Sequence, residues 1–150
     1  MYIVDFIWCK VIIVRNLEEI KKHIKNYNKI LNTFLEIAND FDVNNDRDRD
    51  ALIQIFEYTI ESSWKLWKYF LEYAGLMDLT YPKQVIKEMY ISKLITKPIE
   101  RDQMIDIRNK LSYTYDEEYA DSSALYIMQN GKTLFTKFLS NINSQIWKLQ

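Results

Sequence analysis

The residues with the clearest capacity for chemistry stand together near the end of one predicted helix. Arg108 and Asn109 are followed within two helical turns by Ser112, Tyr113 and Tyr115. An arginine presents a planar set of N–H donors that suits a phosphate group, and the polar side chains that follow it can orient one. Helix ends gather Arg and Asn for structural reasons too, so this cluster alone indicates a phosphate-facing surface without naming a reaction.

The composition excludes several other kinds of site. His23 is the only histidine, so a metal site with two or more histidine ligands is excluded. It stands among Lys21, Lys22 and Lys25, which predicts a solvent-exposed surface residue. Cys9 is the only cysteine, which rules out an internal disulfide and indicates a reducing compartment, the cytoplasm. The formal net charge of -1 provides no overall basic field to attract nucleic acid.

A calcium-loop pattern is partly present before the second predicted helix. Asp46, Asp48 and Asp50 stand at alternate positions, and Glu57 occupies the twelfth place. Ala51, however, stands where the sharp turn of such a loop requires glycine. We therefore interpret the aspartates as negative charges favoured by a helix dipole, and we expect no metal site in this chain.

The stretch Ala51–Gly75 is the helix on which the other elements are expected to depend. Apolar residues recur there at three- and four-residue steps, and further aromatic residues fall outside that stripe. A helix that is apolar on more than one side needs neighbours on several faces, as the central helix of a bundle does. Its polar stripe contains the favourable i,i+4 pair of Glu61 and Lys65. Gly75 ends it with the residue type best suited to a left-handed cap.

Helices also account for the segments on either side. A first helix is expected to start with Asn16 as its cap and Glu19 reaching back to it, and to continue to Phe41. Pro82 predicts the first position of a shorter third helix. The chain breaks again at Pro98.

The C-terminal part predicts two more helices. One contains Met104 and Leu111, and Asp116 is expected to cap the last one. Asn130 and Gly131 interrupt this last helix, where we expect a kink or a local loosening. The whole chain contains only two glycines and two prolines, which argues against an all-β or doubly wound fold. The sequence therefore predicts an all-α helical bundle.

Residues 1–15 form an apolar extension ahead of the predicted bundle domain, which spans residues 16–150. The run Met1–Val14 is too short to cross a membrane and lacks the basic start and cleavage site of a secretory signal. Its β-branched residues would suit a strand, but no second strand is visible to pair with it. We interpret it as a segment that covers a partner or a second copy of the chain.

Two motifs resemble those of the HEPN-type nucleotidyltransferase substrate-binding proteins. The first is Gln54-x-Phe56-Glu57-Tyr58-x6-Lys65, with Trp64 before the lysine. The second is Arg108-Asn109-x-x-Ser112-x-Thr114-Tyr115-Asp116. Pro82, which opens Pro-Lys-x-Val-Ile-Lys-Glu, matches as well. The resemblance covers the chain from about Asn16 to Ile142, with the elements in the same order.

This resemblance implies a four- to five-helix up-and-down bundle, a homodimer, and a separately encoded partner, a minimal nucleotidyltransferase. Such pairs are similar to bacterial toxin–antitoxin modules, in which the HEPN member can be a metal-independent ribonuclease. The partner silences that ribonuclease by transferring AMP to the tyrosine of an Arg-x4-His-x-Tyr motif. ATP and Mg²⁺ are then implied for the partner, nucleotide or RNA is implied as a bound molecule, and this chain needs no cofactor or membrane.

The resemblance also implies residue roles. The substrate- or phosphate-binding residues would be Arg108, Asn109, Ser112, Glu57 and Lys65. Arg108 would hold a phosphate that Asn109 and Ser112 orient, and Tyr115 would be the AMP acceptor. Glu57 and Lys65 would be buried or half-buried polar groups that face the same end of the bundle.

The chain departs from the family motif at Tyr113, which stands in the place of the catalytic histidine. A phenol loses its proton near pH 10 and an imidazole near about pH 6.5, so a tyrosine cannot act as a base at neutral pH as a histidine does. Losing such assistance typically lowers a rate by a factor of about 10²–10⁴. We therefore expect a substrate-binding subunit with a degenerate ribonuclease motif. The alternatives are an active ribonuclease that uses Arg108 and Tyr113, and a helical interaction protein without nucleotide chemistry.

Overall fold

The computed structural model describes the backbone of residues 2–113 and 115–149 and the side chains of residues 17–113 and 115–149. These residues form five helices and no strand. In chain order the helices are α1 (Tyr2–Asn39), α2 (Asp46–Tyr73), α3 (Pro82–Ile91), α4 (Pro98–Tyr113) and α5 (Glu117–Leu149). The predicted all-α bundle of four to five helices is therefore confirmed.

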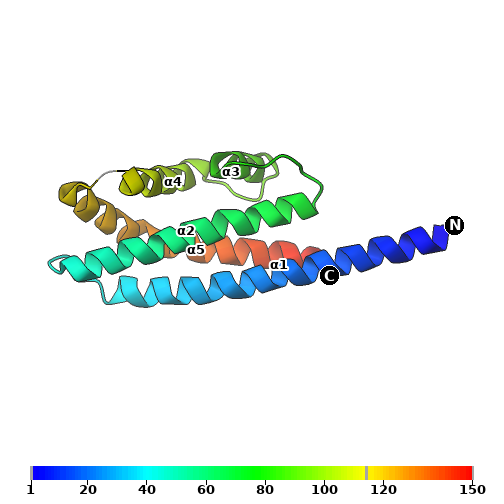
Figure 1. Cartoon of the computed structure of the whole chain (residues 1–150), viewed down its shortest axis with the longest axis horizontal. Coiled ribbons are helices and arrows are strands. Elements are labelled where there is room, and N and C mark those ends of the chain that lie inside the picture. Colours follow the sequence, from blue (N-terminus) through cyan, green and yellow to red (C-terminus); the bar gives the residue numbers. More distant parts are fainter. Residues whose placement is uncertain (1, 114, 150) are drawn as a thin grey trace.

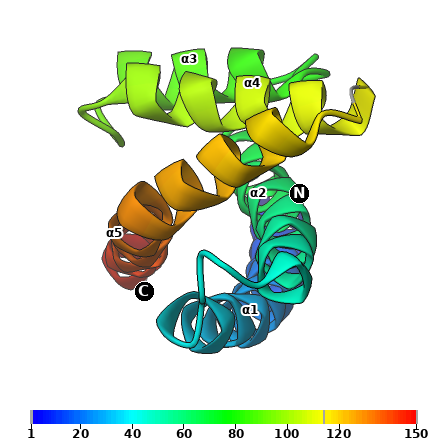
Figure 2. The same cartoon turned by 90° about the vertical axis from the view of Figure 1, so that its left-hand side faces the viewer.

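Helix α2 lies at the centre of the bundle, as its apolar pattern predicts. It packs against each of the other four helices, whereas α1 packs against α2 and α5. Figure 1 shows α1, α2 and α5 side by side along the long axis, with α1 and α2 running in opposite directions. In Figure 2 the shorter helices α3 and α4 lie beside each other, across α2 from α1. The two short helices therefore take the place of one long bundle helix.

Both ends of α2 are closed by local hydrogen bonds. The side-chain oxygen of Asn45 accepts bonds from two backbone N–H groups of the first turn, at 3.0 and 3.4 Å. Asp46 and Asp48 lie in that turn, where the helix dipole favours negative charge. At the other end Gly75 has a φ of 100°, and its N–H donates to the carbonyl of Glu72 at 3.0 Å. The predicted left-handed cap at Gly75 is therefore confirmed.

Helix α1 differs from its predicted start. It begins at Tyr2 and continues to Asn39, so the expected cap at Asn16 is wrong. Asparagine and β-branched residues are only modestly unfavourable in a helix, by less than about 1 kcal/mol each, so an apolar run of this kind can extend one. The suggestion that Met1–Val14 covers a partner concerns side chains outside the described residues. In the described part of the chain, no helix has the length and apolar character required to span a bilayer.

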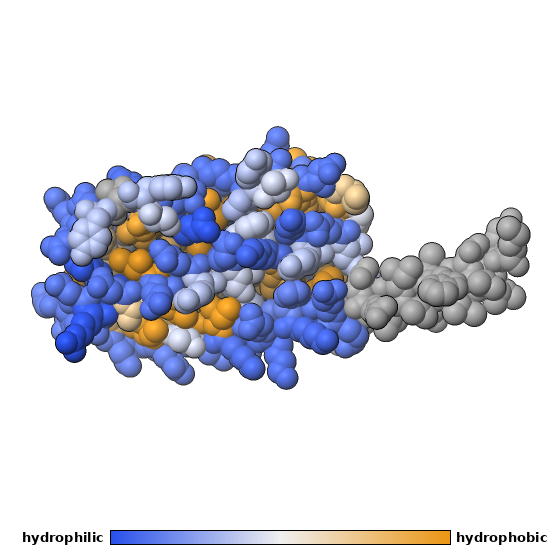
Figure 3. Space-filling view, in the orientation of Figure 1, coloured by the Kyte–Doolittle hydropathy of each residue, from blue (hydrophilic) through white to orange (hydrophobic). Residues whose placement is uncertain are grey.

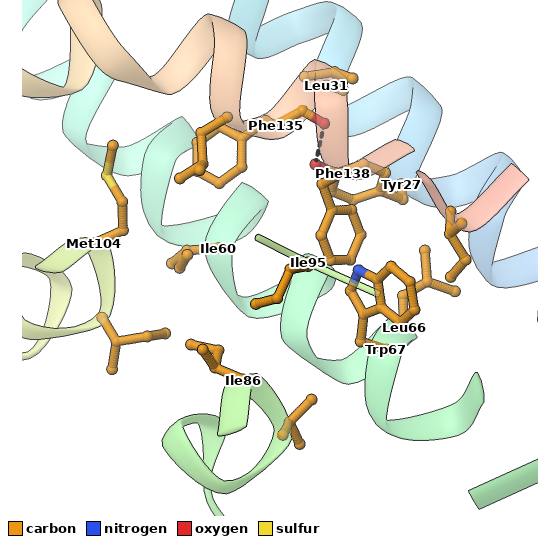
Figure 4. Close-up of a cluster of buried hydrophobic side chains, with 14 of the residues drawn as sticks. Tyr27, Leu31, Ile60, Leu66, Trp67, Ile86, Ile95, Met104, Phe135 and Phe138 are labelled. Carbon is orange, nitrogen blue, oxygen red and sulfur yellow. Dashed lines mark hydrogen bonds between the residues drawn. The ribbon is translucent and has the colours of Figure 1, made fainter. Parts of the chain in front are cut away.

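The core of the bundle is built from aromatic side chains of α1, α2 and α5. Trp67 and Tyr27 are fully buried, and both rings pack against Phe138, with centroids 5.4 and 5.1 Å away. The Tyr27 hydroxyl donates a hydrogen bond to the carbonyl oxygen of Phe135 at 3.0 Å (Figure 4). Burial raises the pKa of Tyr27 well above its usual value, so the hydroxyl keeps the proton that it donates.

Gly131 lets α5 approach α1 closely. The sequence predicts a kink or a local loosening at Asn130 and Gly131. Helix α5 continues through both residues as an α-helix, so the loosening is wrong. A Cβ atom on Gly131 would lie 2.7 Å from Cζ of Phe34, which is itself fully buried and packs edge-on against Phe135. Glycine therefore serves here as the smallest residue at a helix contact.

We expect Gly131→Ala to destabilise the fold by about 1 kcal/mol. Overpacking of a full core typically costs about 1–3 kcal/mol. Alanine is more favourable than glycine in a helix by about 1 kcal/mol, which offsets part of this cost. Chemical denaturation of the wild type and the variant measures the difference. Combining Gly131→Ala with Phe34→Leu removes the close contact, so the double variant should be more stable than the sum of the two single changes indicates. An alanine variant at least as stable as the wild type would contradict the close-contact role.

Candidate functional site

An ion pair joins the two motifs that the sequence places far apart. Nη2 of Arg108 on α4 lies 2.7 Å from Oε2 of Glu61 on α2. Both side chains are about one-third exposed, at 32% each. A charge-assisted bond of this length in a partly buried setting fixes the two helices and the two side chains relative to one another.

Three neighbours complete a network around this pair. Trp64 donates its indole N–H to Oε2 of Glu61 at 3.0 Å, and Nζ of Lys65 lies 3.0 Å from Oε1. On the other side, Nη1 of Arg108 donates to Oδ1 of Asn109 at 2.9 Å. Both carboxylate oxygens of Glu61 are therefore bonded. Arg108 is held in one orientation, and its charge is matched by a carboxylate of the same chain.

The network keeps Glu61 ionised. Partial burial raises the pKa of its carboxyl group, but the hydrogen bonds from Trp64 and Lys65 and the charges of Lys65 and Arg108 outweigh that effect. The pKa of Glu61 therefore lies below its ordinary value. At neutral pH the carboxylate is a permanent counter-charge to Arg108.

Residues of both motifs also line a groove, which lies one helical turn before Glu61 along α2. This groove has a volume of about 270 Å³ and is lined by Gln54 and Glu57 from α2 and by Leu111 and Tyr115 from the end of α4 and the segment after it. Glu57 is half-buried there, whereas Tyr115 is 99% exposed. The groove therefore places a free phenol at the edge of a surface that both motifs build.

The groove is acidic. The carboxylates of Asp50, Glu57, Asp116 and Glu117 line it, and Arg49 is the one cationic residue among its described lining residues. Arg49 already lies 3.0–3.5 Å from three aspartates, so its charge is matched within the chain. A cationic surface of another molecule fits this groove better than an unaccompanied phosphate does.

The predicted site residues are thus divided among the Glu61 network, the acidic groove and the exposed surface of α4. Arg108, Asn109 and Lys65 belong to the network, and Glu57 and Tyr115 to the groove. Glu57 is half-buried as expected, whereas Lys65 is exposed, so its expected burial is wrong. The Ser112 hydroxyl donates to the backbone carbonyl of Arg108 at 3.0 Å, a bond within its own helix. Tyr113 is 88% exposed, and its hydroxyl has no hydrogen bond to another described residue.

The key residue that sequence reasoning left out of the site is Glu61. The sequence could have indicated the role of Glu61, because this residue stands three positions before Trp64 and four before Lys65, and both of them bond to it. The expected i,i+4 pair with Lys65 is confirmed at 3.0 Å. The contact with Arg108 spans 47 residues of chain, and helical periodicity cannot show it.

The only histidine lies in a different setting from the one expected. His23 is half-buried, and its ring stacks on Tyr69 with centroids 4.5 Å apart and planes 17° apart. It lies at the seam between α1 and α2 and belongs neither to the Glu61 network nor to the acidic groove. Among the residues whose side chains are described, no group of three or more His, Cys, Asp or Glu side chains is arranged to hold a metal ion.

Fold and site together define a helical bundle protein whose two motifs form one surface on α2 and α4. The chain belongs to the family described as nucleotidyltransferase substrate binding protein like, whose family model matches residues 19–146. The family identified from the two motifs is therefore confirmed. No curated protein matches the chain.

We expect Glu61→Gln to lower the free energy of unfolding by about 1 kcal/mol at pH 7, a value discounted for the solvent exposure of the pair. The pKa of Glu61 is lower in the folded state than its unfolded value of about 4.3, so this stabilisation is complete above that value. It is lost as the pH falls through the folded-state pKa. Urea denaturation at pH 7 and near pH 3 measures both limits.

Glu72→Gln is the matched control for this prediction. Glu72 lies on the same helix and pairs with Lys68 alone, at 3.7 Å, with 39% of its side chain exposed. Such a pair contributes at most about 0.5 kcal/mol. Equal effects of the two substitutions at pH 7 would contradict a structural role for the Glu61–Arg108 pair.

Proposed function

We propose that this protein is the substrate-binding subunit of a two-protein system and pairs with a separately encoded minimal nucleotidyltransferase, in a module of toxin–antitoxin type. The observation that supports this function best is the Glu61–Arg108 ion pair of 2.7 Å, because it brings both family motifs onto one surface. Trp64, Lys65 and Asn109 also bond to this pair of charges, so side chains of both motifs converge on it. The partner is proposed to contact this surface and the acidic groove beside it.

In this proposal Arg108 binds a phosphate and keeps its hydrogen bonds to Glu61 and Asn109. A guanidinium group has five N–H donors, and Glu61 and Asn109 take one each. The remaining donors and the exposed third of the side chain are available to a nucleotide or an RNA phosphate. Glu61 then acts as a positioning residue, since it holds the guanidinium plane in one orientation before any ligand arrives.

Tyr115 is the proposed AMP acceptor. It is 99% exposed in the short connection between α4 and α5, so another protein's active site can enclose it. In the transfer its phenolic oxygen forms a bond to the α-phosphorus of ATP while the bond from that phosphorus to pyrophosphate breaks. The phenolic proton passes to a base of the partner, whose Mg²⁺ stabilises the charge on the phosphates.

Two other tyrosines could compete for this modification. Tyr113 is 88% exposed but stands in the position of the family's histidine. Tyr119 is half-buried in the first turn of α5, where Nζ of Lys110 lies 4.0 Å from its ring centroid. Its packing makes Tyr119 the poorer acceptor, so Tyr113 is the informative comparison.

The ribonuclease activity of the family is proposed to be weak or absent in this chain. Arg108 supplies the phosphate-binding group, but the adjacent position that needs a base at neutral pH holds Tyr113. His23 cannot replace it from the α1–α2 seam, where it stacks on Tyr69.

The homodimer is likewise proposed. Figure 3 shows the apolar residues of one face as separate patches among hydrophilic ones, and Tyr113 and Tyr115 leave large aromatic surfaces in water. A second copy or the nucleotidyltransferase would cover such groups. Sedimentation velocity at high micromolar concentration measures this directly, and a monomer of the full chain under those conditions contradicts the dimer.

We expect incubation with the partner nucleotidyltransferase, ATP and Mg²⁺ to add AMP to Tyr115, detected by mass spectrometry of peptides. The Tyr115→Phe variant should lose the adduct, because it lacks the nucleophilic oxygen but keeps the ring. Tyr113→Phe is the matched control and should keep it. An unmodified Tyr115 in a complex shown to have formed would leave the protein with a binding function only.

We expect the purified protein to cleave RNA slowly or not at all, and Tyr113→His to raise the rate by about 10²-fold or more, because the imidazole restores acid–base assistance. Cleavage of a labelled RNA without added metal measures the rate. Adding Arg108→Met to Tyr113→His should abolish the gain. Unchanged cleavage by Tyr113→His would show that the assigned residues do not form the ribonuclease site.

A further inference from the structure

A second arginine of α4 is buried without a counter-charge. Arg101 is only 8% exposed, and the one hydrogen bond from its side chain to another described residue runs from Nη1 to the carbonyl oxygen of Lys97 at 3.4 Å. Within the described part of the chain, no carboxylate lies within 4.0 Å of its guanidinium group. Arg108, seven residues later, is paired with Glu61 at 2.7 Å. The less exposed of the two arginines is therefore the one that lacks a carboxylate partner.

Its neighbours compensate this charge only in part. The carboxylate of Glu100 acts on Arg101 from beyond 4.0 Å, but Glu100 is about half exposed and also pairs with Lys97 at 3.4 Å. Tyr27 lies close enough to interact with Arg101, but burial raises the pKa of this phenol, so it is neutral at physiological pH. Burial also lowers the pKa of Arg101, which still leaves a guanidinium protonated at neutral pH. A buried, unpaired charge is unfavourable, and an anion from solution would relieve that.

Arg101 lines a groove that such an anion can enter. The groove has a volume of about 250 Å³ and lies between α4, the segment before it and α5. Lys97 and Lys137 line it together with Arg101, and Glu100 is the one carboxylate among its described lining residues. The difference between three cationic groups and one carboxylate is an excess of two positive charges. This excess occurs in a chain whose formal net charge is -1.

The groove also provides neutral hydrogen-bond donors. Asn130 and Asn141 contribute side-chain amides, and Thr133 contributes a hydroxyl group, all from α5. The Asn130 amide already donates one N–H to the carbonyl oxygen of Tyr126 at 2.9 Å and has a second N–H for a ligand. Two positive charges together with neutral donors match a phosphate monoester, whose charge at neutral pH is about -1.5 to -2. The volume leaves room for a phosphate and an attached group, whereas the backbone of a long nucleic acid would need an extended basic surface.

We propose that the groove between the start of α4 and α5 is a binding site for a small phosphorylated molecule, with its phosphate on Arg101 and Lys97 and Lys137 beside it. This site lies roughly 10 Å along α4 from Arg108, at a rise of about 1.5 Å per residue. It uses none of the residues proposed for the nucleotidyltransferase-binding surface. Its existence is therefore independent of the proposed function.

The test compares inorganic phosphate, AMP and chloride at equal ionic strength, with thermal unfolding and isothermal titration calorimetry as readouts. A ligand that binds the folded state raises its unfolding temperature. We expect phosphate or AMP, but not chloride, to do so in the wild-type protein. A free-phosphate site gives similar affinities for both ligands, whereas a monoester site favours AMP. Either result supports the groove.

Substitutions test whether Arg101 and Lys137 bind the anion. Arg101→Met should weaken it about 100-fold and Lys137→Gln about tenfold, as expected for the loss of charged hydrogen bonds. Replacing a buried charge by an apolar side chain is usually tolerated, and Lys137→Gln tests the groove with Arg101 intact. Arg47→Met removes one exposed positive charge outside the groove and should change nothing.

Two results would overturn the inference. One is a wild-type protein with no response that distinguishes phosphate or AMP from chloride. The other is a response that survives Arg101→Met and Lys137→Gln but is lost in Arg108→Met. In that second case the anion binds at the Glu61 network, and the proposed function would stand while the groove would not.

Discussion

The structure depends on the need of α2 to bury side chains in several directions at once. Leu52, Phe56, Trp67 and Phe70 are buried on it, and no single neighbouring helix could cover them all. The bundle meets this need with α1 on one side of α2, α3 and α4 on the opposite side, and α5 alongside, in contact with α1, α2 and α4. Glu61 and Trp64 are half-buried on this helix, so the network that they form rests on a backbone in contact with four other helices.

Helix α4 packs against both α2 and α5. Its two arginines stand about two turns apart, and only one of them is paired with a carboxylate. Arg108 is fixed by a carboxylate from α2, whereas Arg101 is buried beside a groove shared with α5. Helix α4 therefore contacts both α2 and α5, and an arginine of α4 lies at each of these contacts.

Features determined by neighbours along the chain were predictable from the sequence. The helical bundle, the start of α3 at Pro82, the Gly75 cap and the Asp116 cap follow from periodicity and from residues that favour helix ends. Asp116 accepts a hydrogen bond from the backbone N–H of Tyr119 at 3.2 Å, as an N-cap does. The motifs were sufficient to identify the family as well.

Features determined by distant partners were not predictable in this way. Asn16 has the residue type of a cap, yet the helix extends past it. Gly131 has the residue type of a break, yet it is needed by Phe34, almost one hundred residues earlier. The pairing of Glu61 with Arg108 and the lack of a partner for Arg101 both depend on how helices pack. The sequence placed Arg108, Asn109 and Tyr115 in one cluster, whereas the structure divides them between a network and a groove.

The hydrogen bond from Tyr27 to the carbonyl of Phe135 spans 108 residues and affects the order in which the chain can mature on the ribosome. Helices α1 and α2 are synthesised first and can associate as a hairpin. Until Phe135 has been made, the Tyr27 hydroxyl must either stay in water or be buried without an acceptor, at a cost of about 1–3 kcal/mol. We therefore expect the early hairpin to remain open at its centre until α5 arrives and closes it. Chains cut short before that helix would keep an exposed aromatic seam, which is the kind of surface that cellular quality control acts on.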